Sequence, residues 1–182
     1  MKIVLASNSP RRKELLEQAH FRFEVEPAKV EEVFDESLPI DEALMKVAQT
    51  KAMDVADVYP DYVVIGADTI VYFQGKRLGK PKNKNEAKRC LHALSNQTHE
   101  VKTGVCIIKD HQCYPFVETT KVHFRDVSND EINRYVNSGS CMDKAGAYGI
   151  QECDFVEWID GSYSNVVGLP MERICQFFHV RF

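Results

Sequence analysis

Long hydrophobic runs are absent from this sequence of 182 residues. None of its apolar stretches approaches the ~18 residues that a membrane-spanning helix needs, so no transmembrane segment and no membrane partner are expected. The apolar stretch Ile3 to Ala6 near the N-terminus is too short for the apolar region of a signal peptide. We therefore expect a cytoplasmic protein.

Cysteine patterns that bind metal are also absent. The six cysteines are scattered, without a Cys-x-x-Cys pair and without a histidine at zinc-finger spacing. Isolated cysteines in a cytoplasmic protein usually behave as small apolar residues. We expect buried, reduced thiols.

The chain has no excess of basic residues either. Acidic residues outnumber basic ones, 27 against 23, which gives a formal net charge of −4. The overall field therefore repels nucleic-acid phosphates, and the basic residues form no stripe interleaved with aromatic ones. Stable nucleic-acid binding is not expected, and any bound polyanion must meet a local cluster of cations.

What the sequence does contain is a regular alternation of predicted strands and helices, with no internal repeat and no linker. This pattern predicts one α/β domain over residues 1–182. The predicted strands are Lys2–Ala6, Phe21–Val25, Tyr62–Phe73, Thr98–Lys109, Cys113–Arg125 and Phe155–Ile159. The predicted helices are Pro10 to about His20 and Pro39–Tyr59, with others beginning near Asn83, Ser128 and Pro170, and residues 161–165 are expected to form a loop.

Two kinds of signal set the element boundaries. Capping-box patterns, which mark helix starts, occur at Asn83 with Glu86 and at Ser128 with Glu131. The run Gly66-Ala67-Asp68 is expected to break the strand that begins at Tyr62, because glycine interrupts strands. This break would place a carboxylate at the end of an apolar strand.

The first candidate site is the turn from the first strand into the first helix, which carries Ser7, Ser9, Arg11 and Arg12. Free backbone N–H groups and the helix dipole favour an anion at such a place. Arginines there are unfavourable because their positive charge opposes the helix dipole. Their presence therefore indicates another role, which we interpret as a phosphate clamp. The alternative is a helix capped by Ser9 whose arginines are solvated.

A lysine lies among apolar residues in the helix predicted from Pro39. The apolar positions of this helix are Leu44, Val47, Ala48, Ala52 and Val55. At 100° per residue Lys51 falls within the same stripe. Its side chain either extends past its neighbours into solvent or points into a cleft and holds a buried anion.

Asp68 is the candidate carboxylate of the site. A strand end is where ligands usually bind in α/β folds, although an isolated aspartate there is more often a turn former. Glu31 and Glu32 lie in an acidic loop, where they are either solvated or part of the site. Carboxylates together with cations would suit a magnesium ion that also bridges substrate phosphates.

Two further lysines lie in glycine-containing loops. Lys80 follows Gly79 after a predicted hairpin, and Lys144 begins a glycine loop that ends at Gln151. Glycine lets backbone approach a ligand closely, and a glutamine amide both donates and accepts hydrogen bonds, which suits recognition of a base edge. Taken alone, each loop also reads as an ordinary connection.

Five motifs together resemble those of the Maf family, in the same order and spacing. They are Ser7-Asn8-Ser9-Pro10-Arg11-Arg12, Gly66-Ala67-Asp68-Thr69, Leu78-Gly79-Lys80-Pro81, Asp143 to Gln151, and Asn165-Val166-Val167-Gly168-Leu169-Pro170.

The resemblance implies an elongated, twisted mixed sheet flanked by helices, with two lobes around a central cleft as in the Maf and ITPase folds. It also implies hydrolysis of a nucleoside triphosphate to the monophosphate and pyrophosphate, with a divalent Mg²⁺ or Mn²⁺ ion as cofactor. The family is linked to cell-division arrest and to removal of modified nucleotides, and a homodimer is compatible with it.

The resemblance also assigns roles to individual residues. Asp68 is the expected catalytic base, and Asp68 and Glu32 are the expected metal ligands. The expected substrate-binding residues are Ser7, Arg11, Arg12, Lys51, Lys80 and Lys144. Whether Asp68 acts directly as a base or through a metal-bound water is not decided by the sequence.

Three residues resemble the branch of the family that acts on dTTP and UTP: Arg11, Thr69 and Gln151. Two residues depart from the family pattern, since Ser140 replaces a usual glutamate and Glu152 replaces a usual glycine. A glutamate at 152 would be strained if its backbone required positive φ.

Two functions are alternatives to dTTP/UTP hydrolysis. One is a non-catalytic nucleotide-binding regulator of septum formation, which gains little from a carboxylate beside phosphates, so Asp68 argues against it. The other is a pyrophosphatase of the 7-methyl-GTP branch, which tends to carry an aromatic residue in place of Arg11 and a glutamine in place of Thr69.

Overall fold

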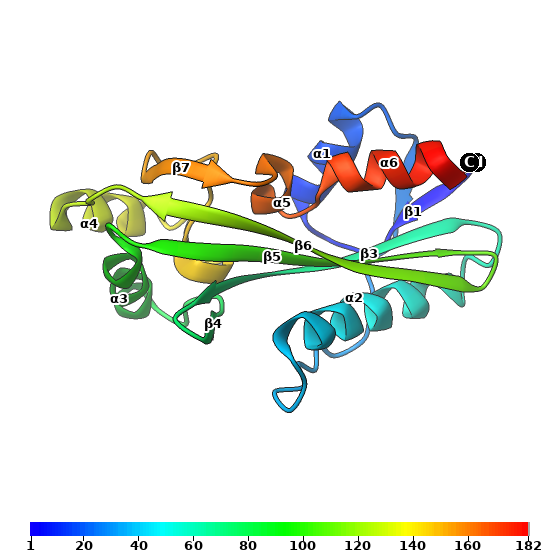
Figure 1. Ribbon diagram of the computed structural model, residues 1–182, viewed down its shortest axis with the longest axis horizontal. Helices are drawn as coiled ribbons and strands as arrows, with labels where there is room; N and C mark the ends of the chain where they lie inside the picture. The colour runs from blue at the N-terminus through cyan, green and yellow to red at the C-terminus, as the bar shows by residue number, and fades with distance from the viewer. Residues whose placement is uncertain (182) are drawn as a thin grey trace. The chain divides into compact units, whose positions relative to one another are not determined.

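The computed structural model describes residues 1–181. Within them seven strands form one sheet in the order β2-β1-β3-β5-β6-β7, with β4 paired to β3. The strands are β1 (Ile3–Leu5), β2 (Phe23–Val25), β3 (Val63–Phe73), β4 (Lys76–Leu78), β5 (Thr98–Lys109), β6 (Gln112–Phe124) and β7 (Val156–Asp160). The helices are α1 (Pro10–Gln18), α2 (Ile40–Ala56), α3 (Lys84–Leu94), α4 (Asn129–Ser138), the 3-10 turn η1 (Ala145–Ala147), α5 (Tyr163–Val167) and α6 (Met171–Arg181) (Figure 1). Parallel and antiparallel pairs both occur, which confirms the predicted mixed sheet flanked by helices.

The chain divides into two units with separate cores. The first unit comprises Met1–Thr69, Thr103–Glu118 and Gly168–Phe182, and the second comprises Ile70–Lys102 and Thr119–Val167. Strands β3, β5 and β6 each contribute residues to both units.

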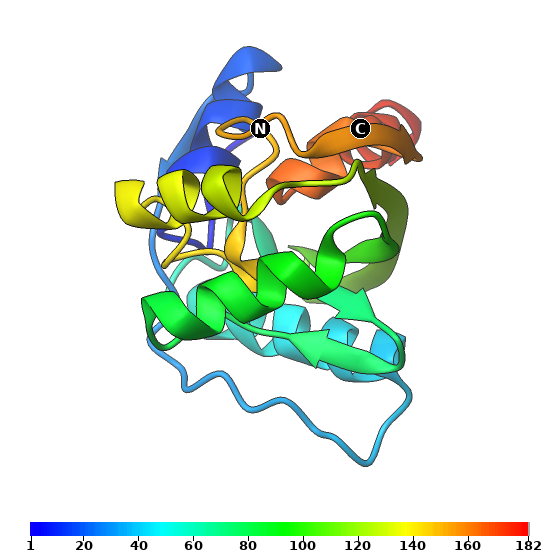
Figure 2. The same ribbon diagram turned by 90° about the vertical axis from the view of Figure 1, so that its left-hand side faces the viewer.

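In the first unit, β1 is parallel to both of its neighbours. Leu5 at its end pairs with Val25 of β2 and Ile65 of β3. Helices α1 and α6 lie on one face of these strands and α2 on the other (Figures 1 and 2). One core cluster under α2 consists of Val4, Ala6, Ala48, Ala52, Val55, Val64, Cys106 and Ile108. The predicted apolar stripe of the long helix is therefore the face that packs on the sheet.

Strand β3 runs without interruption through Gly66 and Asp68, so the predicted break is wrong. Gly66 serves close packing instead, because a Cβ atom there would lie 2.6 Å from the carbonyl oxygen of Ala48 in α2. Gly104 in β5 does the same, since its Cβ would lie 2.7 Å from the carbonyl oxygen of Leu44. Two glycines thus let α2 approach the strands closely.

In the second unit, α3 and α4 pack side by side (Figure 2). Ser128 caps α4 in a complete capping box with Glu131, as predicted. For α3, Asn83 accepts from the backbone N–H of Glu86 as predicted, but the Glu86 carboxylate accepts from the N–H of Lys82 rather than of Asn83. The core of this unit is centred on Leu91, Leu94, Val122, Phe124, Ile132, Val136, Tyr148 and Phe155.

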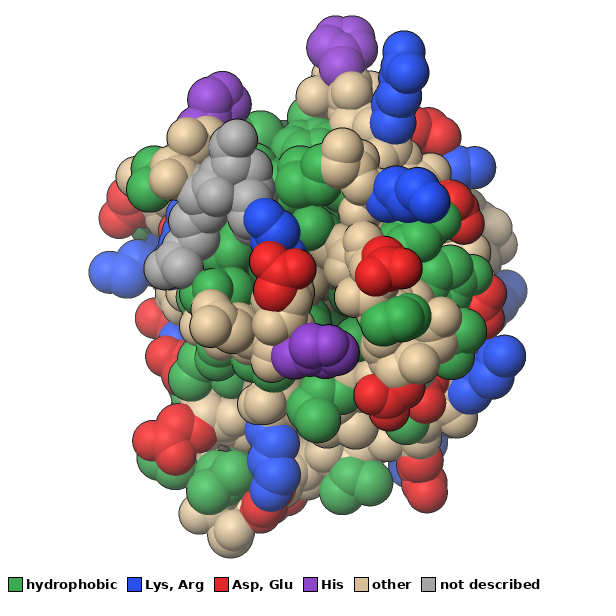
Figure 3. All heavy atoms as spheres, turned by 90° about the vertical axis from the view of Figure 1, so that its right-hand side faces the viewer, with side chains coloured by type: hydrophobic (Ala, Val, Ile, Leu, Met, Phe, Trp, Pro, Cys, Tyr) green, Lys and Arg blue, Asp and Glu red, His purple; other side chains and the backbone are tan. Residues whose placement is uncertain are grey.

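The fold also bears on the predicted loop before the last helix, the cysteines and the membrane. The expected loop at residues 161–165 instead contains most of helix α5. All six cysteines lie within the described residues and are free thiols, with Cys106 and Cys141 buried and the others partly buried. No helix in residues 1–181 is long and apolar enough to cross a membrane. Figure 3 shows one face, on which basic and acidic side chains are intermingled.

Candidate active site

Lys51, Asp68 and Glu32 meet in the first unit and form what we name the carboxylate–lysine cluster. The Lys51 Nζ atom lies 2.7 Å from Asp68 Oδ1 and 2.8 Å from Glu32 Oε1. Lys51 comes from the buried face of α2, Asp68 from β3, and Glu32 from the loop between β2 and α2. The Lys51 side chain is 11% exposed, so its charge is balanced by these two carboxylates rather than by water. The prediction that Lys51 lies on the core face is confirmed.

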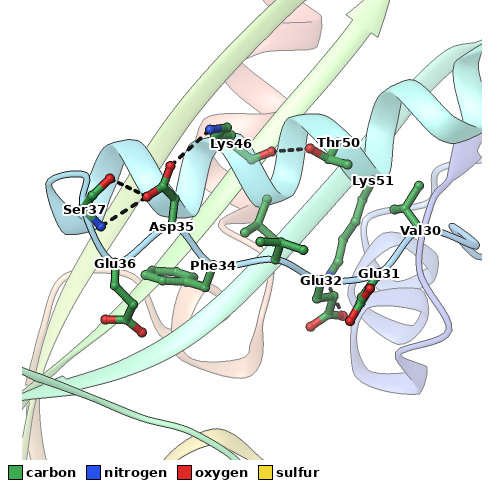
Figure 4. A pocket seen from close by; sticks show the side chains of 12 residues that line it. Val30, Glu31, Glu32, Phe34, Asp35, Glu36, Ser37, Lys46, Thr50 and Lys51 are labelled. Carbon is green, nitrogen blue, oxygen red and sulfur yellow. Dashed lines mark hydrogen bonds and ion pairs between the residues drawn. The ribbon is translucent and has the colours of Figure 1, made fainter.

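The loop that carries Glu32 covers a pocket of about 520 Å³ beside α2. Residues 30–37 of the loop line it, together with Lys46, Val47, Thr50 and Lys51 of the helix. In Figure 4, Lys51 extends from the helix toward Glu32, while Lys46 pairs with Asp35 farther along the same helix. Lys51 therefore faces this pocket and the Asp68 carboxylate at once.

Asp68 lies in the middle of β3, so its predicted place at a strand end is wrong. The neighbouring strand is the one that ends. Because β1 stops at Leu5, which pairs with Ile65, β3 continues beyond the end of its parallel neighbour. The Asp68 side chain is 17% exposed and is reached by Lys51 in this stretch.

Arg12 is the centre of a second group of polar contacts in the first unit, which we name the arginine cluster. Its Nε donates to the carbonyl oxygen of Gly168 at 2.8 Å, Nη1 to Ser7 Oγ at 3.1 Å, and Nη2 to Thr69 Oγ1 at 3.0 Å. Burial lowers the pKa of Arg12, and the negative charge of Asp68 partly opposes that shift. Of the five N–H groups of a guanidinium, these contacts with described residues use three, which leaves two without an acceptor among those residues.

The remaining predicted residues of the first unit surround Arg12. Ser9 caps α1 and Pro10 is its first residue, as predicted. Arg11 is half-buried in the first turn of α1. Thr69 Oγ1 lies 2.9 Å from Thr103 Oγ1, a β5 residue that no sequence pattern singled out. The fixed contacts of Arg12 explain how an arginine is stable at a helix N-terminus despite the dipole.

Lys80, Lys144 and Gln151 belong to the second unit. Lys80 is exposed after β4, and the preceding residue, Gly79, accepts a hydrogen bond at 3.2 Å from the N–H of Gly146. The Lys80 segment and the glycine loop are thus held together.

Gln151 is exposed, whereas Lys144 is only 5% exposed. The Lys144 ammonium donates to the carbonyl oxygen of Ser140 and to Asp143 Oδ1 at 2.8 Å, and it forms an ion pair with Glu152 Oε2 at 3.0 Å.

The donor set for a metal ion is limited to carboxylates. Within residues 1–181 no group of three or more histidine, cysteine, aspartate or glutamate side chains is arranged to hold a metal. Asp68 and Glu32 nevertheless face one positively charged atom, Nζ of Lys51. Two carboxylates, completed by waters and substrate phosphates, are what a Mg²⁺ ion usually takes.

Comparison with known proteins decides the family. Residues 2–180 match the family described as Maf-like protein. The chain belongs to the Maf family. A dTTP/UTP pyrophosphatase from Shouchella clausii is 45% identical over 182 residues, which covers 97% of this chain and 95% of that protein. A protein of the same name from a Geobacillus species is 48% identical over 173 residues, covering 94% and 93%.

The fold of this Maf protein is also found in a solved structure, that of the Staphylococcus aureus Ham1 protein. The two chains superimpose with a TM-score of 0.55 and match over 100% of each. Their sequences are 13% identical, so the likeness concerns the fold alone.

The two residues that depart from the Maf pattern contact the same ammonium group. Ser140 accepts from Lys144 through its carbonyl oxygen, and the Glu152 carboxylate forms an ion pair with the Lys144 ammonium. The backbone of Glu152 does not have positive φ, so the strain considered for it does not arise. The residues of this loop with positive φ are Gly146, at 69°, and Ala147, at 61°.

Proposed function

We propose that this Maf protein hydrolyses dTTP and UTP, and modified pyrimidine nucleotides, to the monophosphate and pyrophosphate. The names of relatives that are 45% and 48% identical over nearly the whole chain support the reaction and the pyrimidine substrates. The observation that carries the proposal in the structure is the carboxylate–lysine cluster, since it holds Asp68 in place in the same unit as the buried Arg12. No comparable support exists for a non-catalytic regulator or for 7-methyl-GTP as the substrate.

In the proposed reaction, water attacks the α-phosphorus and pyrophosphate leaves. Such a displacement depends mainly on positioning and on stabilisation of negative charge. Arg12 is suited to this task because its guanidinium is already oriented by Ser7, Thr69 and Gly168. Lys51 would supply positive charge from the buried face of α2. Arg11 would add a further cation from the first turn of α1.

Lys80 and Lys144 are also proposed to contact the triphosphate. For Lys144 this contact requires a phosphate oxygen to replace one of its three present partners. Asp143 is the most replaceable of them, because its side chain is 65% exposed and can be hydrated when released.

Asp68 is proposed to orient the attacking water and accept its proton. A carboxylate suits that role, and the hydrogen bond that Asp68 accepts from Lys51 at 2.7 Å holds it in place. Asp68 and Glu32 would hold a divalent metal ion, Mg²⁺ or Mn²⁺. When bound, the ion would stabilise negative charge on the phosphate oxygens.

The experiment that tests this function identifies the phosphorus atom that is attacked. UTP is hydrolysed in water enriched in ¹⁸O, with Mg²⁺ or Mn²⁺, and the products are separated by mass. We expect UMP that carries the label and unlabelled pyrophosphate. Label in pyrophosphate, or release of orthophosphate and UDP, would contradict attack at the α-phosphorus. Activity that persists unchanged after metal removal with EDTA would contradict the metal requirement.

A further inference from the structure

The glycine loop of the second unit is attached to helix α4 through one tyrosine. The Tyr135 hydroxyl accepts a hydrogen bond from the backbone N–H of Gly149 at 3.0 Å. The same hydroxyl lies 3.4 Å from Glu152 Oε2, to which it donates. Burial raises the pKa of Tyr135, so its hydroxyl keeps the proton needed for this donation. One side chain of α4 thus contacts both the loop and the residue that follows it.

Glu152 holds the loop from the other side. Its Oε2 atom lies 3.0 Å from the ammonium of Lys144, which starts the loop, and also accepts from Tyr135. The Lys144 ammonium donates hydrogen bonds to Ser140 and Asp143, and it forms an ion pair with Glu152. Ser140 offers only a neutral carbonyl, so two carboxylates balance the buried charge of Lys144. Glu152 is the less exposed of the two, because the side chain of Asp143 is 65% exposed.

Gly149 lies at the centre of these contacts. A Cβ atom at this residue would lie 2.8 Å from Cε of Lys144 and 3.2 Å from Oε2 of Glu152. The lysine stem and the glutamate carboxylate therefore pack directly on the backbone that Tyr135 holds. We name Tyr135, Lys144, Gly149 and Glu152 the loop brace.

We propose that Glu152 is a positioning residue: through the loop brace it fixes the backbone beside Gln151 and thereby sets the preference of the enzyme for pyrimidine nucleotides. The part that concerns base preference rests on the proposed function. The part that concerns loop order does not. Glu152 acts on Gln151 because the two are adjacent in the chain, so a shift of one moves the backbone of the other.

The first arm of the test measures loop order without nucleotide. Amide hydrogen exchange of a peptide covering residues 143–151 is compared in the wild type, Glu152→Ala, Tyr135→Phe and the control Glu157→Ala. Glu157 is a matched carboxylate of the same unit, 59% exposed and paired with His123. We expect exchange at least ~10-fold faster in the first two variants and unchanged in the control. Unchanged exchange in Glu152→Ala would overturn the loop brace.

The second arm measures base preference with the same proteins. In Glu152→Ala we expect the KM for UTP to rise about 10-fold with kcat within about 2-fold, while kcat/KM for ATP changes little, so that the UTP-to-ATP ratio falls. A residue with a purely structural role would lower stability without moving this ratio. A UTP-to-ATP ratio that is unchanged in an active Glu152→Ala variant would overturn the role in base preference.

A double variant shows whether the two side chains act together. If Glu152 and Tyr135 belong to one brace, Glu152→Ala/Tyr135→Phe should lower the UTP-to-ATP ratio no further than the more affected single variant. Full additivity of the two effects would overturn their joint action. A wild-type protein that hydrolyses no nucleoside triphosphate would refute the proposed function, while the exchange measurements would still decide the loop brace.

Discussion

Lys51 occupies a helix position that its periodicity assigns to the core, and its ammonium reaches two carboxylates from there. We predict that Lys51→Met lowers kcat/KM for UTP at least ~10-fold, because it removes the charge nearest Asp68. The far-UV circular dichroism spectrum should stay native, since methionine fits an apolar stripe. Lys46 is the matched control, since it lies on the same helix with its side chain 61% exposed. Equal activities of Lys51→Met and Lys46→Met would show that Lys51 only stabilises the fold.

Asp68 is the residue on which the proposed chemistry depends most. We predict that Asp68→Asn lowers kcat by at least ~100-fold. An effect of this size is expected when a general base is lost, or when a carboxylate that holds a metal-bound water is lost. Asparagine preserves size and hydrogen bonding, so the protein should remain folded, which circular dichroism checks. Asp61→Asn, at an exposed turn, provides the control. Turnover close to that of the wild type would refute the assigned role.

At the scale of elements, the close approach of α2 to β3 and β5 positions Lys51. We predict that Gly66→Ala lowers the free energy of unfolding by about 1–3 kcal/mol or more, because a methyl group 2.6 Å from the Ala48 carbonyl oxygen forces the helix away. Gly79→Ala should change it little, since that residue has open space around its Cβ position. Urea unfolding of both variants provides the measurement. Equal stability of the two would contradict the packing argument.

The features that the sequence predicted well depend on residues near one another in the chain. The buried position of Lys51 follows from a helical period that spans about three turns. Ser9 and Ser128 cap their helices through contacts three residues away. Such contacts need no knowledge of the tertiary fold, so pattern reasoning finds them.

The features that the sequence did not predict depend on distant partners. A glycine in a strand signals either a break or a close approach, and only the packing of α2 shows that Gly66 serves the second purpose. Arg12 was a candidate from its helix, but its acceptor Gly168 lies 156 residues away. Thr103 carries no local signal at all. The assignment of Glu152 as a partner of Lys144 likewise required the fold of the loop.

At the scale of the whole molecule, acid stability depends on a buried histidine in the second unit. His99 is 2% exposed, its Nε2 lies 2.7 Å from the Tyr148 hydroxyl, and its buried Nδ1 has no hydrogen-bond partner among the described residues. Burial lowers the pKa of His99 from 6.5 to about 4, so the folded protein holds this side chain neutral. The unfolded chain takes up a proton below pH 6.5 and the folded chain does not until pH reaches about 4.

The unfolding free energy should therefore decrease as the pH is lowered from 6.5 to about 4. We predict that the unfolding free energy of the wild type drops by about 3 kcal/mol more than that of His99→Gln between pH 7 and pH 4, because glutamine does not titrate. Urea unfolding at several pH values gives both curves. A difference between the two proteins that does not change with pH would show that His99 titrates alike in the folded and unfolded states.

The choice of base is a property of the whole enzyme. We predict that UTP and dTTP are hydrolysed ahead of ATP, GTP and 7-methyl-GTP, by about 10- to 100-fold in kcat/KM. A pyrimidine edge alternates O4, N3–H and O2, and the Gln151 amide can match it by donating and accepting, whereas a mismatched base leaves the amide unpaired. The comparison is made with Gln151→Ala, which should reduce the discrimination while hydrolysis continues. If a purine ranked first for the wild type, the assignment to pyrimidine nucleotides would be wrong, although Asp68 and the cations near it would still account for hydrolysis.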